Sequence, residues 1–500
     1  MARHLVSLSN LHNVIHKFEL SEKEYKQSLE IFSRLVKNNS DVFLPDYAKN
    51  LINLATLHKE MCKYDLAEDE YNKALDIVRN LVESNGDAFS DLLGVNLSGL
   101  ANIHSLLQKY DLAEKEFNEA LDIYRKLVEI KPARFLSEVA LNLGNLGTLH
   151  YVLQKVDIAE KEYNETLSIY RKLAKINTEP ILPDLVRTLA NLANLHSDLH
   201  KYELAQKEYT EAIKCLNHLI KKNPERFLLR QAIYLGNLAN IHKELQKYDL
   251  AEKEFNEALM IFRGLTDENS NTYTANIALI LGNLANLHFE LQDYELANKE
   301  YTDALSLFQK LEPNCIDTYI VNIALCLNNQ ALSNLALKEP DVSTKCFQQA
   351  LDIYRKLAGK YPDKFSPHVA MILVSLARIN SIYKNYNSAQ SEYEEALDIY
   401  KNFSERTPMI FLPEVADILC KLGNIHRNLH NDELSQNRFI EALDIYRMLA
   451  KKNPKEYKPL VEYIQRNILN ENPLSQYSDL QKEEPGWFKC IINKILKLFR

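Results

Sequence analysis

The chain has 500 residues, with 60 Lys and Arg against 68 Asp and Glu, which gives a net charge of −8 at neutral pH. This mild acidity argues against a nucleic-acid-binding protein, which would carry a basic surface. Only 11 residues are glycine, so strand-rich folds, doubly wound folds and enzymes with phosphate-binding glycine loops are disfavoured. The 7 cysteines are odd in number and far apart in the sequence, which is typical of a reduced, intracellular protein. We therefore expect a cytoplasmic protein.

The N-terminal residues 1–17 lack the long apolar core and the small-residue cleavage site of a secretory signal. No window of the chain holds 18 consecutive apolar residues, so the sequence predicts no membrane-spanning helix. The repeats described next begin almost at the first residue. We expect no other domain before them.

The dominant feature is a repeat with a period of 46 residues, which occurs ten times without insertion. A small residue recurs at this interval, an aromatic residue follows it by four positions, and a second small residue usually follows it by seven. Such regular spacing predicts ten copies of one structural unit. The first small-residue column consists of Ser21, Ala67, Ala113, Ala159, Ala205, Ala251, Ala297, Ser343, Ala389 and Ser435.

Each repeat is predicted to form two helices joined by a short turn. In the sixth repeat, apolar residues follow helical spacing over 232–245 and again over about 250–265. Polar segments with Asn and Pro, such as 221–226, are expected to end one repeat and to lead into the next. An aromatic residue returns after nearly every such segment, so we expect these connectors to be held in place. One helix pair cannot bury both of its faces, and the repeats should therefore stack into an elongated superhelix.

The repeat resembles the tetratricopeptide repeat family. In the third repeat, the family positions hold Leu100, Ala101, Tyr110, Ala113, Phe117 and Ala120. Two features depart from the family pattern: the period exceeds the usual 34, as it does in kinesin light chains, and a histidine such as His104 replaces the tyrosine of the first helix. The resemblance implies an all-α superhelical solenoid over residues 1–470. It also implies a non-catalytic scaffold that binds peptide segments or partner helices in the concave groove lined by the first helices.

The eighth repeat departs most from the others. Gln330 replaces a leucine, Asn334 replaces the histidine, and Pro340 disrupts the turn sequence. A hinge or a local partner site could explain these changes. Drift in one of ten copies is the interpretation that we favour.

The histidine column recurs in eight of ten repeats and includes His58, His104, His150 and His196. Metal binding is disfavoured because zinc ligands lie within about 2.3 Å of one ion, whereas equivalent residues of stacked repeats lie roughly 10 Å apart. We expect these histidines to be structural, and we expect no metal site and no cofactor.

Uncharged amides form two columns, three residues apart, on one face of the first helices. An ordinary solvent-facing surface would carry Glu and Lys, so repeated amides indicate a surface for hydrogen bonding, and an asparagine can match both the N–H and the C=O of an extended peptide. Alternatively, the amides bond to neighbouring repeats and hold the stack together. The candidate peptide-binding residues are Asn53, Asn145, Asn191, Asn194, Asn237, Asn240, Asn283, Asn286 and Asn329.

The C-terminal end is predicted to consist of a capping helix over 459–470, a polar linker over 471–485 and a basic amphipathic helix over 486–500. The last segment carries four positive charges, which suits weak contact with an anionic membrane surface or docking onto a protein, including the acidic solenoid itself. Its candidate docking residues are Trp487, Phe488, Lys489, Ile491, Ile492, Lys494, Ile495, Lys497, Leu498, Phe499 and Arg500.

No motif of a nucleotide-binding loop, a serine hydrolase or a zinc protease is present, and we predict no catalytic residues. The favoured function is a scaffold for protein or peptide partners in the cytoplasm, without nucleic-acid binding. One alternative is a peripheral membrane adaptor that is anchored by its C-terminal helix and uses the solenoid as a spacer. Another is an oligomerising structural rod.

Overall fold

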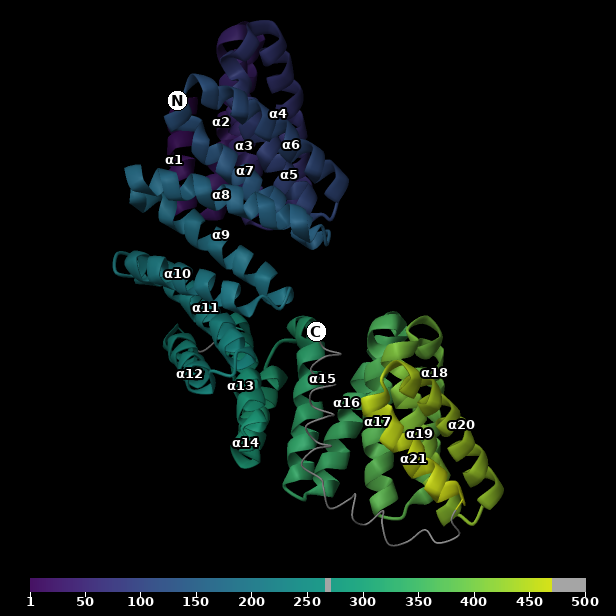
Figure 1. The fold of residues 1–500 in the computed structure, drawn as a ribbon. Coiled ribbons are helices and arrows are strands. Elements are labelled where there is room, and N and C mark those ends of the chain that lie inside the picture. Colours follow the sequence, from purple (N-terminus) through teal and green to yellow (C-terminus); the bar gives the residue numbers. More distant parts are fainter. Residues whose placement is uncertain (266–270, 470–500) are drawn as a thin grey trace. The chain divides into compact units, whose positions relative to one another are not determined.

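The computed structural model describes residues 1–265 and 271–469, and all regular elements within these ranges are helices (Figure 1). The predicted all-α class is therefore confirmed. The chain forms two compact units, Met1–Leu245 and Gln246–Arg500. In each unit, every helix packs against the next helix in the chain. This is the arrangement of a helical solenoid, in which odd-numbered and even-numbered helices are the first and second helices of successive repeats.

The first unit contains eleven α-helices and one short 3-10 helix, and the boundary between the units falls within the sixth repeat. The elements are α1 (Ala2–Val14), α2 (Phe18–Asn38), α3 (Ser40–Glu60), α4 (Tyr64–Asn85), η1 (Gly86–Phe89), α5 (Ser90–Leu106), α6 (Tyr110–Ile130), α7 (Pro132–Val152), α8 (Val156–Ile176), α9 (Thr178–Asp198), α10 (Tyr202–Ile220) and α11 (Pro224–Glu244).

The second unit contains ten helices in its described part, and the last of them, α21, has no described second helix as a partner. This helix begins five residues before the predicted start of the capping helix. The elements are α12 (Tyr248–Leu265), α13 (Asn271–Glu290), α14 (Tyr294–Gln309), α15 (Pro313–Ala336), α16 (Pro340–Lys360), α17 (Pro362–Ile382), α18 (Tyr386–Arg406), α19 (Pro408–Asn428), α20 (Asp432–Lys452) and α21 (Pro454–Leu469).

The second helices bury the residues that define the repeat. In α6, Ala113 and Ala120 are completely buried and the Phe117 side chain is 1% exposed. Alanine lets neighbouring helix backbones approach closely, while the aromatic ring four residues away fills the space between them. The small and aromatic columns of the sequence are therefore the packing surface of each repeat.

A tight turn with one left-handed residue joins the two helices of every repeat. In the third repeat, Gln108 has φ 60°. The Lys109 N–H donates to the His104 carbonyl at 2.8 Å, and the Gln108 N–H donates to the Ser105 carbonyl at 3.2 Å. This pair of bonds defines a Schellman motif, which satisfies carbonyls at the helix end. The ten left-handed positions hold Gln, His, Lys or Cys, although glycine adopts this conformation at lower cost.

The polar connector expected at 221–226 is shorter than predicted. Helix α10 ends at Ile220, as expected, but α11 already begins at Pro224 and includes Phe227. Proline is favourable in the first turn of a helix, where its missing N–H would have no partner within the helix. The Asn223 side chain accepts a hydrogen bond from the Arg226 N–H and so caps the start of α11, while its backbone N–H donates to the Leu219 carbonyl at the end of α10.

The aromatic residues after the connectors are held in place, as expected. Phe135 in α7 lies 6.3 Å from Tyr124 in α6, and Phe411 in α19 stacks on Tyr400 in α18 at 5.8 Å, measured between ring centroids. Each of these rings packs against the last turns of the preceding helix. These contacts fix the start of each of these first helices against the preceding repeat.

The eighth repeat keeps the common architecture, with α15 and α16 joined by the same left-handed turn at Lys338. Its unusual polar residues are bonded inside the stack: the Gln330 amide donates to Thr302 Oγ1 at 2.8 Å, and the Asn334 amide donates to the Gln330 carbonyl at 3.0 Å. The substitutions are therefore accommodated by local hydrogen bonds.

Helix α17 is the one described helix that is long and apolar enough, by length and composition alone, to cross a membrane. Of its most apolar window, 61% is buried inside the fold. The core helix of a helical stack meets the same criteria, so we make no membrane assignment from it.

Candidate functional site

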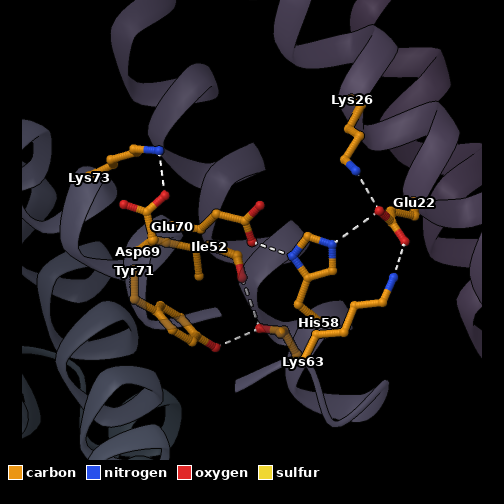
Figure 2. Close-up of polar contacts among 10 residues, drawn as sticks. Glu22, Lys26, Ile52, His58, Lys63, Asp69, Glu70, Tyr71 and Lys73 are labelled. Atoms are coloured by element: carbon orange, nitrogen blue, oxygen red, sulfur yellow. Dashed lines mark hydrogen bonds and ion pairs between the residues drawn. The ribbon is translucent and has the colours of Figure 1, made fainter. Parts of the chain in front are cut away.

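The buried histidine column lies between carboxylates of two successive repeats. Figure 2 shows this arrangement around His58, which is 1% exposed. Its Nδ1 lies 2.7 Å from Glu70 Oε2 in the same repeat, and its Nε2 lies 3.4 Å from Glu22 Oε1 in the preceding repeat. Lys63, at the start of α4, holds the same Glu22 at 2.8 Å. We call such a set an inter-repeat His–Glu cluster.

The cluster recurs around His104, with close geometry. The Nδ1 atom lies 2.7 Å from Glu116 Oε2, the Nε2 atom lies 3.1 Å from Glu68 Oε1, and Lys109 binds Glu68 at 2.6 Å. The corresponding pairs of the next two clusters are His150 with Glu162 (2.7 Å), His150 with Glu114 (3.2 Å), Lys155 with Glu114 (2.8 Å), His196 with Glu208 (2.8 Å), His196 with Glu160 (3.2 Å) and Lys201 with Glu160 (2.9 Å).

The electrostatics around His104 and His196 favour the charged form of the ring. Burial lowers the pKa of His104, but the hydrogen bonds and charges of Glu116 and Glu68 outweigh it, so that the pKa is raised above its ordinary value. The pKa of His196 is raised for the same reasons. The hydrogen bond from Lys109 is the main cause that lowers the pKa of Glu68. Each ionised partner therefore stabilises the other.

The clusters weaken and change composition in the second unit. His288 keeps its 2.7 Å contact with Glu300, but its distance to Glu252 in the preceding repeat is 3.7 Å. At the equivalent position of the ninth repeat, the amide of Asn380 donates to Glu392 at 2.9 Å.

His426 of the tenth repeat has no carboxylate at the position that the other clusters use, because Arg438 occupies it. Burial and the charge of Arg438 lower the pKa of His426.

The arrangement of the histidines suits a structural role better than ligation of an ion. Each ring nitrogen of His104 faces a carboxylate oxygen at hydrogen-bond distance, so both nitrogens are already engaged. Across the described residues, no group of three or more His, Cys, Asp or Glu side chains has the geometry to hold a metal ion. The glutamate partners lie 12 residues after and 36 residues before each histidine, and our sequence interpretation did not include them.

The asparagine columns on the first helices take part in a second network. The Tyr209 hydroxyl in α10 donates to Asn194 Oδ1 in α9 and accepts a 2.8 Å hydrogen bond from the Asn237 amide in α11. This tyrosine therefore links amides of two successive repeats. Both asparagines are partly buried. The network holds the stack together, as expected from the alternative in which these amides bond to neighbouring repeats.

The same connections occur elsewhere with small variations. The Asn191 amide donates to Thr148 Oγ1 at 3.3 Å. In the second unit, Asn286 Oδ1 accepts hydrogen bonds from the Tyr301 hydroxyl at 2.6 Å and from the Asn329 amide at 2.9 Å. Five of the nine predicted amides are thus bonded internally. An amide offers two donors and an acceptor oxygen with two lone pairs, so each of the five keeps further hydrogen-bonding capacity.

The other four candidates, Asn53, Asn145, Asn240 and Asn283, are partly buried, and their amides make no hydrogen bond within the described part of the chain. For two of them, the missing hydrogen bond follows from a change of residue in the aromatic column of the second helices. The position 28 residues before Asn237 holds a tyrosine, whereas the same position before Asn145 and Asn283 holds Phe117 and Phe255. A phenylalanine has no hydroxyl to offer, so these two amides lack the partner that Tyr209 gives to Asn237.

The candidate residues of the C-terminal segment 486–500, and the linker 471–485, lie outside the described residues. The proposals for this segment therefore rest on its sequence alone.

Comparison with known proteins identifies the repeats. Sequence models described as tetratricopeptide repeat match residues 46–126, 186–217 and 232–263. No curated protein matches the chain. Among solved structures, a signal transduction ATPase with a tetratricopeptide repeat sensor from Pyrococcus horikoshii is 15% identical, with 77% of this chain and 53% of that chain covered and a TM-score of 0.51.

Two further solved structures are similar. The quorum sensor NprR from B. thuringiensis is 14% identical over 78% of this chain and 99% of its own, with a TM-score of 0.48. BtubC (BKLC) from P. vanneervenii is 23% identical over 49% of this chain and 91% of its own, with a TM-score of 0.40.

The chain is a helical-repeat protein built from stacked helix pairs. The repeats that the sequence models match are tetratricopeptide repeats, which confirms the family resemblance seen in the sequence. The closer likeness to kinesin light chains stays a prediction.

Proposed function

We propose that this protein is a scaffold that binds extended peptide segments of partner proteins along the amide-bearing face of its first helices. The observation that carries the proposal is the pair Asn145 and Asn283, whose uncharged amides make no hydrogen bond within the described part of the chain. One of these lies in each unit. An amide that is partly buried and not used by the fold is suited to bond the backbone of a ligand.

Several weak bonds would supply the affinity. Each hydrogen bond contributes about 1 kcal/mol net, and ordering a flexible peptide offsets much of the total. We therefore expect dissociation constants of about micromolar. Specificity would come from neighbouring side chains on the same helices, such as the exposed Val95 and Leu106 of α5 and Val152 of α7. These favour a peptide with apolar side chains over the third and fourth repeats.

A matched set of variants tests this proposal. Peptides enriched from a random display library on the full chain would be labelled with fluorescein and titrated against each variant. N145A and N283A are expected to weaken peptide binding several-fold and to leave the melting temperature unchanged. N237A and N286A remove amides that the stack uses, so they are expected to lower the melting temperature. Unchanged peptide affinity in the N145A N283A double variant would exclude the proposed site.

A second proposal concerns the segment 486–500, whose sequence is basic and amphipathic. As a peripheral membrane adaptor in the cytoplasm, the protein would attach to anionic lipid through this segment. Full-length protein would then sediment with liposomes that contain phosphatidylserine, and a variant in which Trp487, Ile491 and Ile495 are each replaced by Ser would not. Equal sedimentation of the two proteins would rule out the adaptor proposal.

A further inference from the structure

The three most regular His–Glu clusters pose a problem of proton counting. A neutral imidazole carries one N–H and one lone pair, so it can donate to only one of two flanking carboxylates. In the cluster of His104, carboxylate oxygens lie at hydrogen-bond distance from both ring nitrogens, at 2.7 and 3.1 Å. When both carboxylates are ionised, only the doubly protonated imidazolium satisfies both contacts. His150 and His196 have the same geometry.

The two bonds of each ring have different structural roles. The shorter bond, from Nδ1, joins the two helices of one repeat, since His104 is in α5 and Glu116 is in α6. The longer bond, from Nε2, reaches Glu68 in α4 and so joins two repeats. When the ring holds a single proton, the shorter contact should keep it. Loss of one proton therefore removes the bond between repeats and leaves the hairpin intact.

We propose that His104, His150 and His196 act as a pH-sensitive coupling device, in which imidazolium bridges hold the second to fifth repeats rigidly together and the contacts between these repeats loosen when the proton on Nε2 leaves for solvent. The same helices form the amide-bearing face, so the loosening would change the spacing of that face. The device does not depend on the identity of any ligand.

The charged groups that face each ring are few. For His104 they are Glu116 from α6, Glu68 from α4, and Lys109, which is ion-paired to Glu68. For His196 they are Glu208 from α10, Glu160 from α8, and Lys201, which is ion-paired to Glu160. For His150, the matching set is Glu162 from α8, Glu114 from α6, and Lys155 on Glu114.

The lysines continue to hold the glutamates after a histidine has lost its proton. Neutralisation should therefore soften the contact between repeats without separating them.

The direction of the pH dependence follows from the raised pKa of His104 and His196. A histidine whose pKa is higher in the folded state than in the unfolded state contributes its full stabilisation below the unfolded pKa of about 6.5. That stabilisation is lost as the pH rises through the folded pKa. The coupled repeats should therefore be most rigid in mildly acidic solution and should loosen in the alkaline direction.

Hydrogen exchange of the full-length protein, corrected for intrinsic rates, tests the device between pH 6 and pH 9. We expect protection of α4 to α9 to fall several-fold with rising pH, and protection of α17 to α20 to stay constant. The triple variant H104N H150N H196N imitates the natural Asn380, which donates to Glu392 without titrating, and it should remove the pH dependence. H200N changes an exposed histidine of the same unit and should preserve it. A wild-type profile without pH dependence over α4 to α9 would overturn the proposal.

A spectroscopic measurement distinguishes the device from a purely structural role. In protein labelled with ¹⁵N histidine, signals that disappear in H104N and in H196N should show both ring nitrogens protonated at pH 6. A neutral tautomer at pH 6 for either residue would contradict the proposal.

If the triple variant does not fold, E68Q E114Q E160Q provides a second test, because Gln occupies the same column at 206 and 390. Removing these negative charges should lower the pH at which protection from hydrogen exchange is lost. An unchanged transition pH would count against the imidazolium bridges.

Discussion

The third to fifth repeats and the eighth to tenth repeats share one backbone plan but join their neighbours by different chemistry. In the earlier group, buried ionised pairs such as His104 with Glu68 cross from one repeat to the next. In the later group, the same position holds Asn334, Asn380 or a His426 whose pKa is lowered. Stacking of the repeats therefore does not require ionic bridges. Where the bridges occur, they make the contact between repeats depend on the protonation state of the histidine.

The largest effect is expected at Gly99 in α5, where an added Cβ atom would lie 2.5 Å from ring carbons of the buried Tyr71. We expect G99A to cost about 1–3 kcal/mol, because this ring would have to shift away from its contact with Thr56. In the second unit, Gly359 of α16 has open space around it, so G359A should stabilise its helix by about 0.5–1 kcal/mol. Chemical denaturation measures both values, and a neutral G99A would show that the packing is looser than described.

The contrast between the groups can be reversed by one substitution. R438E places a carboxylate at the position, 12 residues after His426, that the clusters of the first unit use. An opposite charge within about 4–6 Å raises the pKa of a histidine by about 1–3 units. Titration of the His426 ring by NMR should therefore show the pKa moving from below to above its ordinary value. No upward shift in R438E would mean that position alone does not create a cluster.

The turn is a feature that both groups share, and it should respond equally in both. Gln108 and Lys384 both have positive φ, at 60° and 63°. Glycine adopts this conformation without steric cost, so Q108G and K384G should each stabilise the protein by about 0.5–1 kcal/mol. Melting temperature measures the gain. A gain in only one of the two variants would show that the turns are not equivalent.

The smallest effect concerns the loss of folding stability at acidic pH. Lysine partners are the first cause that lowers the pKa of Glu68, Glu114 and Glu160. A carboxylate with a lowered folded pKa stabilises the protein above its unfolded pKa of about 4.3, and this contribution is lost as the pH falls through the folded pKa.

K109M should remove part of that contribution, worth about 0.3–1 kcal/mol because the pair is partly exposed. Denaturation at pH 7 and pH 3 checks the prediction. The destabilisation should be present at pH 7 and reduced at pH 3, and equal destabilisation at the two pH values would contradict it.

The sequence was sufficient to predict the period, the helix pairs and the packing columns, because a small residue, such as Ala113, and an aromatic residue, such as Phe117, recur in every copy in the same register. It placed the start of the next helix too late at Pro224, because asparagine and proline can both end one helix and begin another.

The candidate site was predicted only in part. The amide columns were evident, but nothing local in the sequence separates Asn237, which bonds Tyr209, from Asn145, which does not meet a hydroxyl. The tyrosine lies 28 residues earlier, beyond the reach of helical periodicity. Aligning the ten copies with one another would have supplied this signal. It would also have shown that the eighth repeat loses the histidine and the glutamate 12 residues later together, as Asn334 and Cys346.

The constant spacing of the His–Glu clusters makes the repeats interchangeable. Each histidine takes its outer carboxylate from 36 residues earlier, and its inner one from 12 residues later, in three copies in a row. Excision of residues 132–177 would therefore bring His196 and Lys201 opposite Glu114, where His150 and Lys155 now lie. This part of the stack, the third to fifth repeats, could shorten or lengthen by whole copies through in-frame recombination, with each remaining histidine of the three still facing two carboxylates.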